Sequence, residues 1–468
     1  MLVIISDLHI TDNSTSDNVD GTAFVNILGP SIKESMSPNN KNADELHIVL
    51  LGDIFDLVRT NHWVANVPYD DRPWNGSLDP FTAMNNNNAL INSQFEAILD
   101  KILNTQSAKG LISMLDSFSD GVNGKQTKIT YVIGNHDRIL NNFPSLQNKI
   151  KSALSDNLEI TFASKVEEKN YGVLARHGHE YDNECYAIDL WNEVMHKDRR
   201  LNRFAPELSK MMAIGEVLTA ELMAGFIFKI NEIFKDNKWS SSNDIQFLHG
   251  LLDVNSLRPM TSMFIWLRWY SRNQESRYQD ALKDALLFAL QNVLNSKLSE
   301  QWDNTNKPIL FKGYLAGDIT DKLEAAKDDL EAGGLAKVEE TMTRLLDLKS
   351  IVDFFVRNNN DDSLVDGAEQ EFKNPSLDNS IQYIVYGHTH EARQDFFKAD
   401  LSGKVSMYIN TGTYLPFIQL CRDKKGFAFS HFMTMTFFYK ENEDTSNRRG
   451  NGPTCELWDG IRRKYYTS

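Results

Sequence analysis

Histidines and carboxylates gather in five short blocks of the sequence, and glycine opens three of them. The blocks are Asp7-Leu8-His9, Gly52-Asp53-Ile54-Phe55-Asp56, Gly134-Asn135-His136-Asp137, His177-Gly178-His179 and Gly387-His388-Thr389-His390. They hold six of the eleven histidines, a concentration that random placement on a surface would not give. Two-residue spacing in the first and last blocks directs both side chains to one side of an extended chain. Each of these two blocks can therefore present its polar groups to a single ligand.

These side chains are typical ligands of a transition-metal site. Carboxylate oxygens, imidazole nitrogens and one amide oxygen suit Mn²⁺, Fe or Zn²⁺, whereas Ca²⁺ prefers oxygen alone and structural zinc prefers thiolates. Taken alone, Asp7 and His9 would be a hydrogen-bonded pair at a strand end, but the other four blocks favour metal binding. The set is too large for one ion. Two divalent ions bridged by one carboxylate would use all the ligands and generate a hydroxide nucleophile at neutral pH.

Apolar runs that are typical of β-strands lead into the blocks. The runs are residues 2–6, 47–51, 129–133, 172–176 and 381–386. Most are apolar on both faces, as in strands at the middle of a layered α/β sheet. Because the ligands of such sheets collect at the carboxyl ends of the strands, we expect all five blocks to face one crevice.

The pattern of the chain changes twice. Between residues 186 and 380 nearly every segment follows a helical period, and strand-like runs return at residue 381. We therefore predict a split α/β domain, residues 1–185 and 381–468, that carries an all-helical insertion at residues 186–380. The insertion begins soon after His177 and ends just before His388. We therefore expect it to form a cap that overhangs the site and sets substrate choice.

Composition and charge indicate which kinds of partner and which cellular location to expect. Hydrophobic residues make up 41% and the net charge is −15, which suits a globular protein that repels polyanions. Three scattered cysteines do not make a disulfide framework, and no basic leader precedes the first apolar run. The apolar stretch at residues 208–234 carries charges such as Glu216 and Glu221, which favours an amphipathic helix over a membrane span. We expect a soluble cytoplasmic protein with no membrane span and no nucleic-acid-binding stripe; its oligomeric state stays open.

In their order and spacing the blocks resemble the signature of the calcineurin-like metallophosphoesterases, which reads D-x-H, G-D-x-x-D, G-N-H-[DE], H and G-H-x-H. Every block matches, and the resemblance covers the split domain but not the insertion. It implies a four-layer α/β/β/α sandwich of the metallophosphoesterase type. It also implies two divalent metal ions per chain, Mn²⁺ in the first place and Fe or Zn²⁺ as alternatives.

The resemblance also implies a role for each matching residue. One ion would be held by Asp7, His9 and His390. The second would be held by Asn135, His177 and His388, with Asp53 bridging the two. His136 would protonate the departing oxygen, and Asp56 would orient its imidazole.

Two departures from better-known branches bear on the substrate. Ser/Thr protein phosphatases of this superfamily carry Arg-Gly directly after G-D-x-x-D, but Leu57-Val58 follow here. A phosphate clamp would then come from Arg59, Arg138 or Arg176, and we predict substrate binding by Arg138 and Arg176. The pyrophosphatases that cleave UDP-diacylglucosamine share D-L-H and L-G-D-I-F-D but carry G-N-R-D where this chain has His136.

The sequence therefore predicts a phosphohydrolase that cleaves phosphate mono- or diesters of a phosphorylated small molecule or nucleotide. Attack by a metal-bridging hydroxide, with His136 as the general acid, is the expected mechanism. A nucleotide or lipid pyrophosphatase and a nuclease of the same superfamily stay open as alternatives. A non-catalytic interaction scaffold is the alternative from another class, and the complete ligand set disfavours it.

Overall fold

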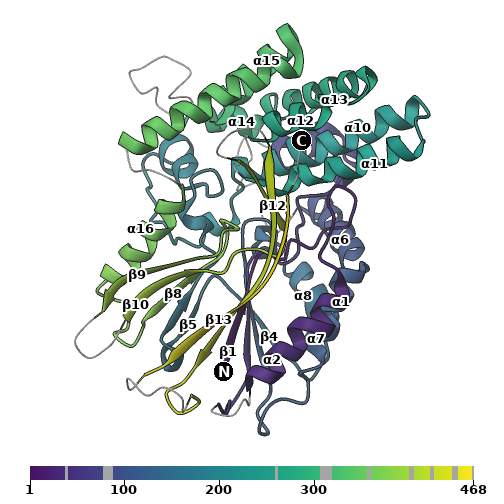
Figure 1. The fold of residues 1–468 in the computed structure, drawn as a ribbon. Helices are drawn as coiled ribbons and strands as arrows, with labels where there is room; N and C mark the ends of the chain where they lie inside the picture. Colours follow the sequence, from purple (N-terminus) through teal and green to yellow (C-terminus); the bar gives the residue numbers. More distant parts are fainter. Residues whose placement is uncertain are drawn as a thin grey trace.

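The strands that precede the first three blocks lie side by side in one large sheet (Figure 1). A computed structural model of the chain describes residues 1–36, 41–76, 88–258, 262–305, 319–355, 360–399, 405–421, 426–444 and 452–465. The strands of this sheet are β1 (Leu2–Ile5), β2 (His47–Leu51), β3 (Lys128–Val132), β4 (Glu159–Ala163), β7 (Leu257–Arg258), β11 (Pro416–Leu420), β12 (Phe427–Tyr439) and β13 (Thr454–Tyr465). Their order is β4-β3-β2-β1-β12-β11-β7, with β13 beside β12.

The register of this sheet follows from its apolar strands. Strands β1 to β4 run parallel, with Val3 opposite Ile48 and Ile48 opposite Ile129. Strand β12 runs antiparallel to β1 and sets Phe437 opposite Val3. The parallel strands therefore end together, and the blocks that follow β1, β2 and β3 meet at one edge.

A smaller sheet carries the last two blocks. Its strands are β5 (Val166–Glu168), β6 (Val173–Ala175), β8 (Tyr383–Tyr386), β9 (Arg393–Ala399) and β10 (Val405–Asn410), in the order β5-β6-β8-β10-β9. Strands β6, β8 and β10 run parallel. The blocks that begin at His177 and Gly387 follow β6 and β8, so they too leave the sheet at neighbouring positions.

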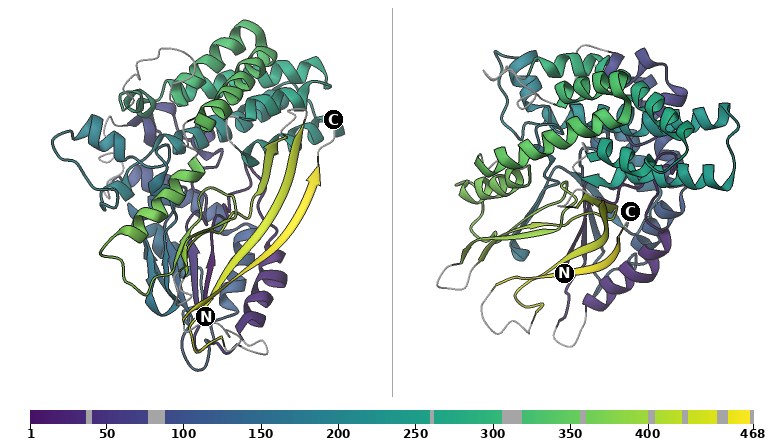
Figure 2. Two further views of the ribbon diagram at one scale, coloured as in Figure 1. Left: turned by 60° about the vertical axis from the view of Figure 1, so that its left-hand side comes forward. Right: turned by 45° about the horizontal axis from the view of Figure 1, so that its top comes forward.

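The two sheets pack face to face through an apolar layer that includes Ile4 and Val49 from one sheet and Val385 and Ile409 from the other. Helices cover both outer faces (Figure 2). On the larger sheet these are α1 (Gly21–Ala23), α2 (Gly29–Met36), α6 (Ala89–Leu103), α7 (Gln106–Asp116) and α8 (Pro144–Ser152). On the smaller sheet α16 (Asn360–Lys373) packs through Leu364. The α/β class predicted from the sequence is confirmed.

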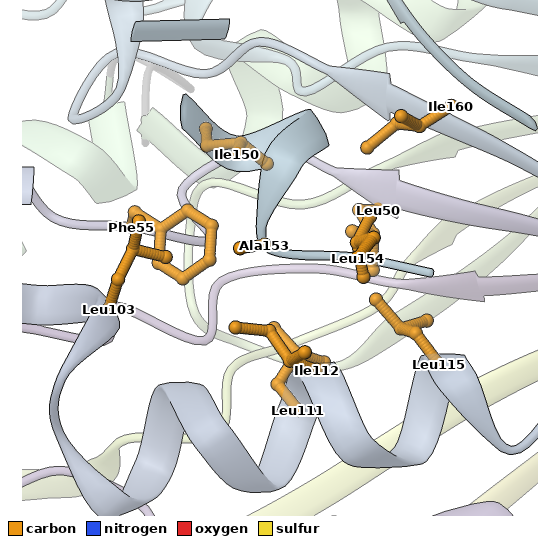
Figure 3. Close-up of a pocket in the computed structure, with 10 residues that line it drawn as sticks. All are labelled: Leu50, Phe55, Leu103, Leu111, Ile112, Leu115, Ile150, Ala153, Leu154 and Ile160. Carbon is orange, nitrogen blue, oxygen red and sulfur yellow. The ribbon is translucent and has the colours of Figure 1, made fainter. Parts of the chain in front are cut away.

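Packing between the larger sheet and its helices leaves a cavity of about 10 Å³ (Figure 3). Its lining is wholly apolar and includes Leu50, Phe55, Leu111 and Ile150. A cavity this small with no polar partner does not hold water. It is a packing defect behind the second block and has no chemical role.

The insertion lies across the ends of the strands that carry the blocks (Figure 1). Its helices are α9 (Ile214–Val217), α10 (Gly225–Asp236), α11 (Ser242–Leu251), α12 (Met263–Ser271), α13 (Ser276–Leu294), α14 (Lys297–Asp303) and α15 (Ile319–Phe355), with a kink in α15 at Gly334. The expectation of an all-helical insertion is wrong in one respect. Strand β7 pairs in parallel with β11 at the edge of the larger sheet. A strand of two residues is too short to give a periodic signal.

The stretch Leu208–Asp236 contains an 18-residue window that is apolar enough to cross a membrane by composition, with a mean hydropathy of 1.6, but 94% of that window is buried inside the protein. From Ile214 to Asp236 the helical structure is continuous, through α9, a π-helical segment (Leu218–Ala224) and α10. All residues of the π-helical segment are buried, whereas α10 is amphipathic as expected: it buries Phe226, Ile230 and Phe234 and exposes Asn231 and Lys235.

Candidate metal centre

The first group of candidate ligands lies where β1 and β8 end, and its three residues come from the two sheets. The ligand atoms of Asp7, His9 and His390 all lie within 4.8 Å of one another, and all three residues are buried. The Nε2 atoms of His9 and His390 are 2.9 Å apart. Asp7 Oδ1 lies 3.8 Å from the first of these nitrogens and 3.6 Å from the second. This is the group that the resemblance assigns to one ion.

A second group follows β2, β3, β6 and β8. Asp53, His177 and His388 place their ligand atoms within 4.8 Å of one another. His177 Nε2 lies 3.1 Å from Asn135 Oδ1 and 3.2 Å from Asp53 Oδ2. The same Asp53 oxygen is 3.7 Å from His9 Nε2 in the first group. Asp53 thus joins the two groups, as a bridging carboxylate must.

Backbone strain is concentrated at these residues. Eight non-glycine residues in the described part of the chain have a positive φ, and five of them are candidate ligands. The five are Asp7 (50°), His9 (44°), Asp53 (53°), His388 (72°) and His390 (66°). Each such conformation costs on the order of 1–3 kcal/mol and persists where a site requires it. The backbone strain therefore supports a functional site at these residues, and this support does not depend on the side-chain distances.

Neighbouring groups fix how three of the imidazoles are presented. His177 donates from Nδ1 to the carbonyl oxygen of Leu51 at 2.9 Å. His9 donates from Nδ1 to Asp56 Oδ2 at 3.0 Å, and His388 Nε2 donates to Asp182 at 3.0 Å. Each ring therefore keeps one nitrogen lone pair for an ion, which is the usual arrangement of metal-binding histidines. Asp182 was not predicted, because nothing in its local sequence marks it.

The charges of the centre depend strongly on one another. Burial alone would raise the pKa of Asp53, but the imidazoles of His177, His136 and His9 hold that pKa well below its usual value. Burial opposes protonation of His177, yet Asp53 and Asp7 raise its pKa to about 10. An ion binds only the deprotonated ring, so metal binding here would displace a proton. The mixed set of carboxylates, imidazoles and one amide oxygen fits divalent metal ions.

His136 and Asp56 lie beside the first ligand group. His136 Nδ1 is 2.9 Å from Asp56 Oδ2, and the His136 backbone N–H donates to Asp53 Oδ1 at 2.8 Å. The side chain of Asp56 is fully buried, whereas that of His136 is 13% exposed and can reach a ligand. Burial would lower the pKa of His136, but Asp56 and Asp53 raise it. Two residues predicted to act together are thus in contact.

Arg138 and Arg176, for which the sequence predicts substrate binding, each contact a glutamate. Arg138 forms a buried ion pair with Glu216 at 2.7 Å. Arg176 pairs with Glu371 at 2.7 Å and lies over the ring of Phe204. Both guanidinium groups belong to the split domain and are held by glutamates of the insertion. These two ion pairs indicate that the arginines hold the insertion against the split domain.

Arg258 reaches the centre from β7 in the insertion, and sequence reasoning missed it. It donates from Nη2 to His390 Nδ1 at 2.6 Å. Burial and the nearby Arg59 lower the pKa of Arg258 to about 10. His179, the second histidine of its block, is buried against the rings of His177 and His388. No sequence signal singles out Arg258 within a region of helical periodicity.

Comparison with known proteins assigns no family. No protein-family model matches the chain, and no curated protein matches its sequence.

Proposed function

We propose that this protein is a dinuclear metal-dependent phosphohydrolase that cleaves phosphate mono- or diesters. The observation that carries the proposal is the position of Asp53 Oδ2, 3.2 Å from His177 Nε2 and 3.7 Å from His9 Nε2. One carboxylate oxygen within reach of two ligand groups is what a two-metal centre requires. The packing of two sheets between outer helices supports the same proposal, because the resemblance implies a four-layer α/β/β/α sandwich.

The chain offers ligands for both ions. Asp7, His9 and His390 would hold one, Asn135, His177 and His388 the other, and Asp53 would bridge them. Bound divalent ions of this kind activate water at neutral pH and neutralise charge on the phosphoryl oxygens. Mn²⁺ is the first candidate, and Fe or Zn²⁺ would suit the same nitrogen and oxygen ligands.

The residues around the ions supply the proton. His136, partly exposed, donates a proton to the departing oxygen of the ester. Asp56 holds the imidazole at 2.9 Å and favours its protonated form. The buried ligands exclude bulk water from one side of the reacting group. A non-catalytic scaffold would have no need of this acid.

Turnover after metal reconstitution tests the proposal. The purified protein is treated with a chelator, reloaded with Mn²⁺, Fe²⁺ or Zn²⁺, and assayed with p-nitrophenyl phosphate and bis-p-nitrophenyl phosphate. We expect hydrolysis of at least one ester and two ions per chain by elemental analysis, and Asp53→Asn should lose both ions. Absence of turnover with every metal, or full activity with one ion, would overturn the proposal.

A further inference from the structure

Two guanidinium groups lie together beside the metal centre, that of the buried Arg59 and that of the half-buried Arg258. They donate from their Nη1 atoms to the same carbonyl oxygen, that of Asn255, at 3.4 and 3.3 Å. Arg59 has one carboxylate nearby, Asp56, whose Oδ2 lies 3.2 Å from Arg59 Nε. Among the residues that the structure describes, no carboxylate forms an ion pair with Arg258, and Asp7 acts on it only from a distance.

Three further buried arginines, all in the split domain, each have a carboxylate partner. Arg72, Arg138 and Arg176 each contact a buried glutamate, at distances of 2.6, 2.7 and 2.7 Å. Burial of a charge is costly unless a partner balances it. The pair formed by Arg59 and Arg258 thus departs from the pattern of this molecule. Arg59 Nε is also buried with no hydrogen-bond partner of good geometry.

The Arg258 guanidinium, which donates to His390, could donate to a different acceptor when His390 binds an ion. His390 directs Nε2 toward His9 and Asp7, and it accepts from Arg258 at Nδ1. A neutral imidazole whose Nε2 binds an ion carries its hydrogen on Nδ1, which then cannot accept. If His390 Nε2 held an ion, Arg258 Nη2 would lose this acceptor, while Nη1 would keep the backbone oxygens of Asn255 and Leu257. An anion next to the reacting phosphate would then accept from Nη2.

We propose that Arg258 and Arg59 form an anion subsite for a second phosphate of the substrate, adjacent to the phosphate under attack. The inference rests on the proposed function of the metal centre and changes the bond that is cleaved. The substrate would be a phosphoanhydride, as in the pyrophosphatase alternative that the sequence leaves open, in place of a simple mono- or diester. Arg258 donates to Nδ1 of His390, across the ring from the Nε2 atom that faces His9 and Asp7, so the subsite would lie beside the first ligand group and not between the two groups. Planar guanidinium groups match phosphate oxygens in two-point hydrogen bonds.

The reaction balances with water alone. The oxygen of water bonds to the attacked phosphorus, and the bridging P–O bond breaks with its electron pair on the second phosphate. His136 gives a proton to the departing oxygen and regains one from the attacking water. The two arginines face the charge that develops on the departing phosphate, where such groups contribute most.

A binding experiment tests the subsite without turnover. Metal-loaded protein is titrated calorimetrically with imidodiphosphate, a non-hydrolysable two-phosphate probe, and with orthophosphate. We expect Arg258→Met to weaken imidodiphosphate binding by about tenfold to a hundredfold and orthophosphate binding by less than about threefold, because one charge-assisted contact is lost. Arg258→Lys should recover part of the loss. The exposed Arg272→Met serves as the matched control and should change neither affinity.

Activity and metal content separate the outcomes. We expect Arg258→Met to lower kcat/KM by the same factor for ADP-ribose and inorganic pyrophosphate, and by a clearly smaller factor for p-nitrophenyl phosphate, which has no second phosphate. Loss on ADP-ribose alone would assign the subsite to nucleotide anhydrides, and loss on both would assign it to any phosphoanhydride. Equal losses for one-phosphate and two-phosphate probes, or fewer than two ions in Arg258→Met, would overturn the subsite, because Arg258 would then only position His390. An inactive wild-type protein would instead count against the phosphohydrolase itself.

Discussion

At the scale of single residues, one carboxylate connects the candidate acid to the candidate ligands. Asp56 Oδ2 lies 2.9 Å from His136 Nδ1 and accepts a hydrogen bond from His9 Nδ1 at 3.0 Å. The pKa of Asp56 is held well below its usual value; burial opposes this, but His136 and Arg59 outweigh it. A permanent negative charge at this position stabilises an imidazolium on one side and orients a ligand on the other. The two histidines should therefore respond differently to substitution.

His136→Asn should lower turnover by about 10²–10⁴-fold while two ions remain bound, because it removes a proton donor and no ligand. The loss should depend on the leaving group. An alkyl alkoxide needs its proton in the transition state, whereas p-nitrophenolate departs without one. Steady-state rates with an alkyl and a p-nitrophenyl ester, together with elemental analysis, measure both effects. Equal losses on the two esters, or a missing ion, would mean that His136 is a positioning residue or a ligand.

Asp56→Asn should impair both histidines. We expect weaker catalysis than wild type, and also an affinity for the ion at His9 that is lower by about 10–100-fold, since a group that orients a metal ligand is lost. Competition with a coloured chelator measures the affinity. His136→Asn is the matched control, because it leaves the His9 contact intact. If Asp56→Asn binds both ions as tightly as wild type, the contact with His9 has no role in metal binding.

At the scale of elements, the strands that end in motifs were predicted and the edge strands were not. The runs before Asp7, Asp53 and Gly134 are apolar on both faces because they lie between a sheet and a helical layer. Strands β9 and β13 lie at edges or carry polar residues, so their local pattern is weak. The polar composition of the segment after Thr11 favours a loop, yet residues 21–36 are helical.

That helical segment shows which signal was available. Phe24, Leu28 and Ile32 are four residues apart and all buried, which is a helical stripe. Asp20 caps it by accepting from the backbone N–H of Thr22. The abundant asparagine and serine residues around this stripe favour a loop and so weaken the helical signal. The alternation of apolar residues in β12 is typical of a half-buried strand, but residues 434–439 are buried on both faces because this part of the strand packs against both neighbouring layers.

The start of α11 gives a prediction at this scale. Asp244 accepts from the Ser241 backbone and hydroxyl at 2.7 Å and from the Tyr278 hydroxyl at 2.6 Å. The hydrogen bond from Tyr278, followed by that from Ser241, lowers the pKa of Asp244 to about 2. A carboxylate with a depressed pKa stabilises the fold above its unfolded pKa near 4, and this contribution is lost as the pH falls through the folded value.

Asp244→Asn should therefore lower the melting temperature at pH 6, and its difference from wild type should shrink between about pH 4 and pH 2. Differential scanning calorimetry in chelator, which keeps ion loss out of the comparison, measures the difference. The exposed Asp280→Asn in α13 is the control and should show no such dependence. A difference that stays constant down to pH 2 would contradict the assigned role of the Asp244 carboxylate.

At the scale of the whole molecule, three buried arginine–glutamate ion pairs within the described residues join the split domain to the insertion. Arginines 72, 138 and 176 come from the split domain, and their partners Glu221, Glu216 and Glu371 come from the insertion. The sequence placed all five blocks at strand ends because each motif directly follows an apolar run. It could not pair Arg138 with Glu216 or Arg258 with His390, because those contacts join residues 78 and 132 positions apart through a fold that no local pattern specifies.

Substitution of the Arg138–Glu216 pair decides between docking and substrate binding. Glu216→Gln leaves a buried guanidinium without its charge partner, so the free energy of unfolding should fall by about 3–5 kcal/mol. Arg138→Met should have a similar effect. The double variant Arg138→Met with Glu216→Met replaces the buried pair by apolar groups and should recover most of that stability, since neither charge is then left alone.

Urea denaturation of the two single variants and the double variant, with p-nitrophenyl phosphate turnover in parallel, measures both properties. If Arg138 docks the insertion, activity should return with stability in the double variant, because the guanidinium itself makes no contact with the substrate. If stability returns and turnover does not, Arg138 binds phosphate as the sequence predicted, and the ion pair with Glu216 only holds it in place.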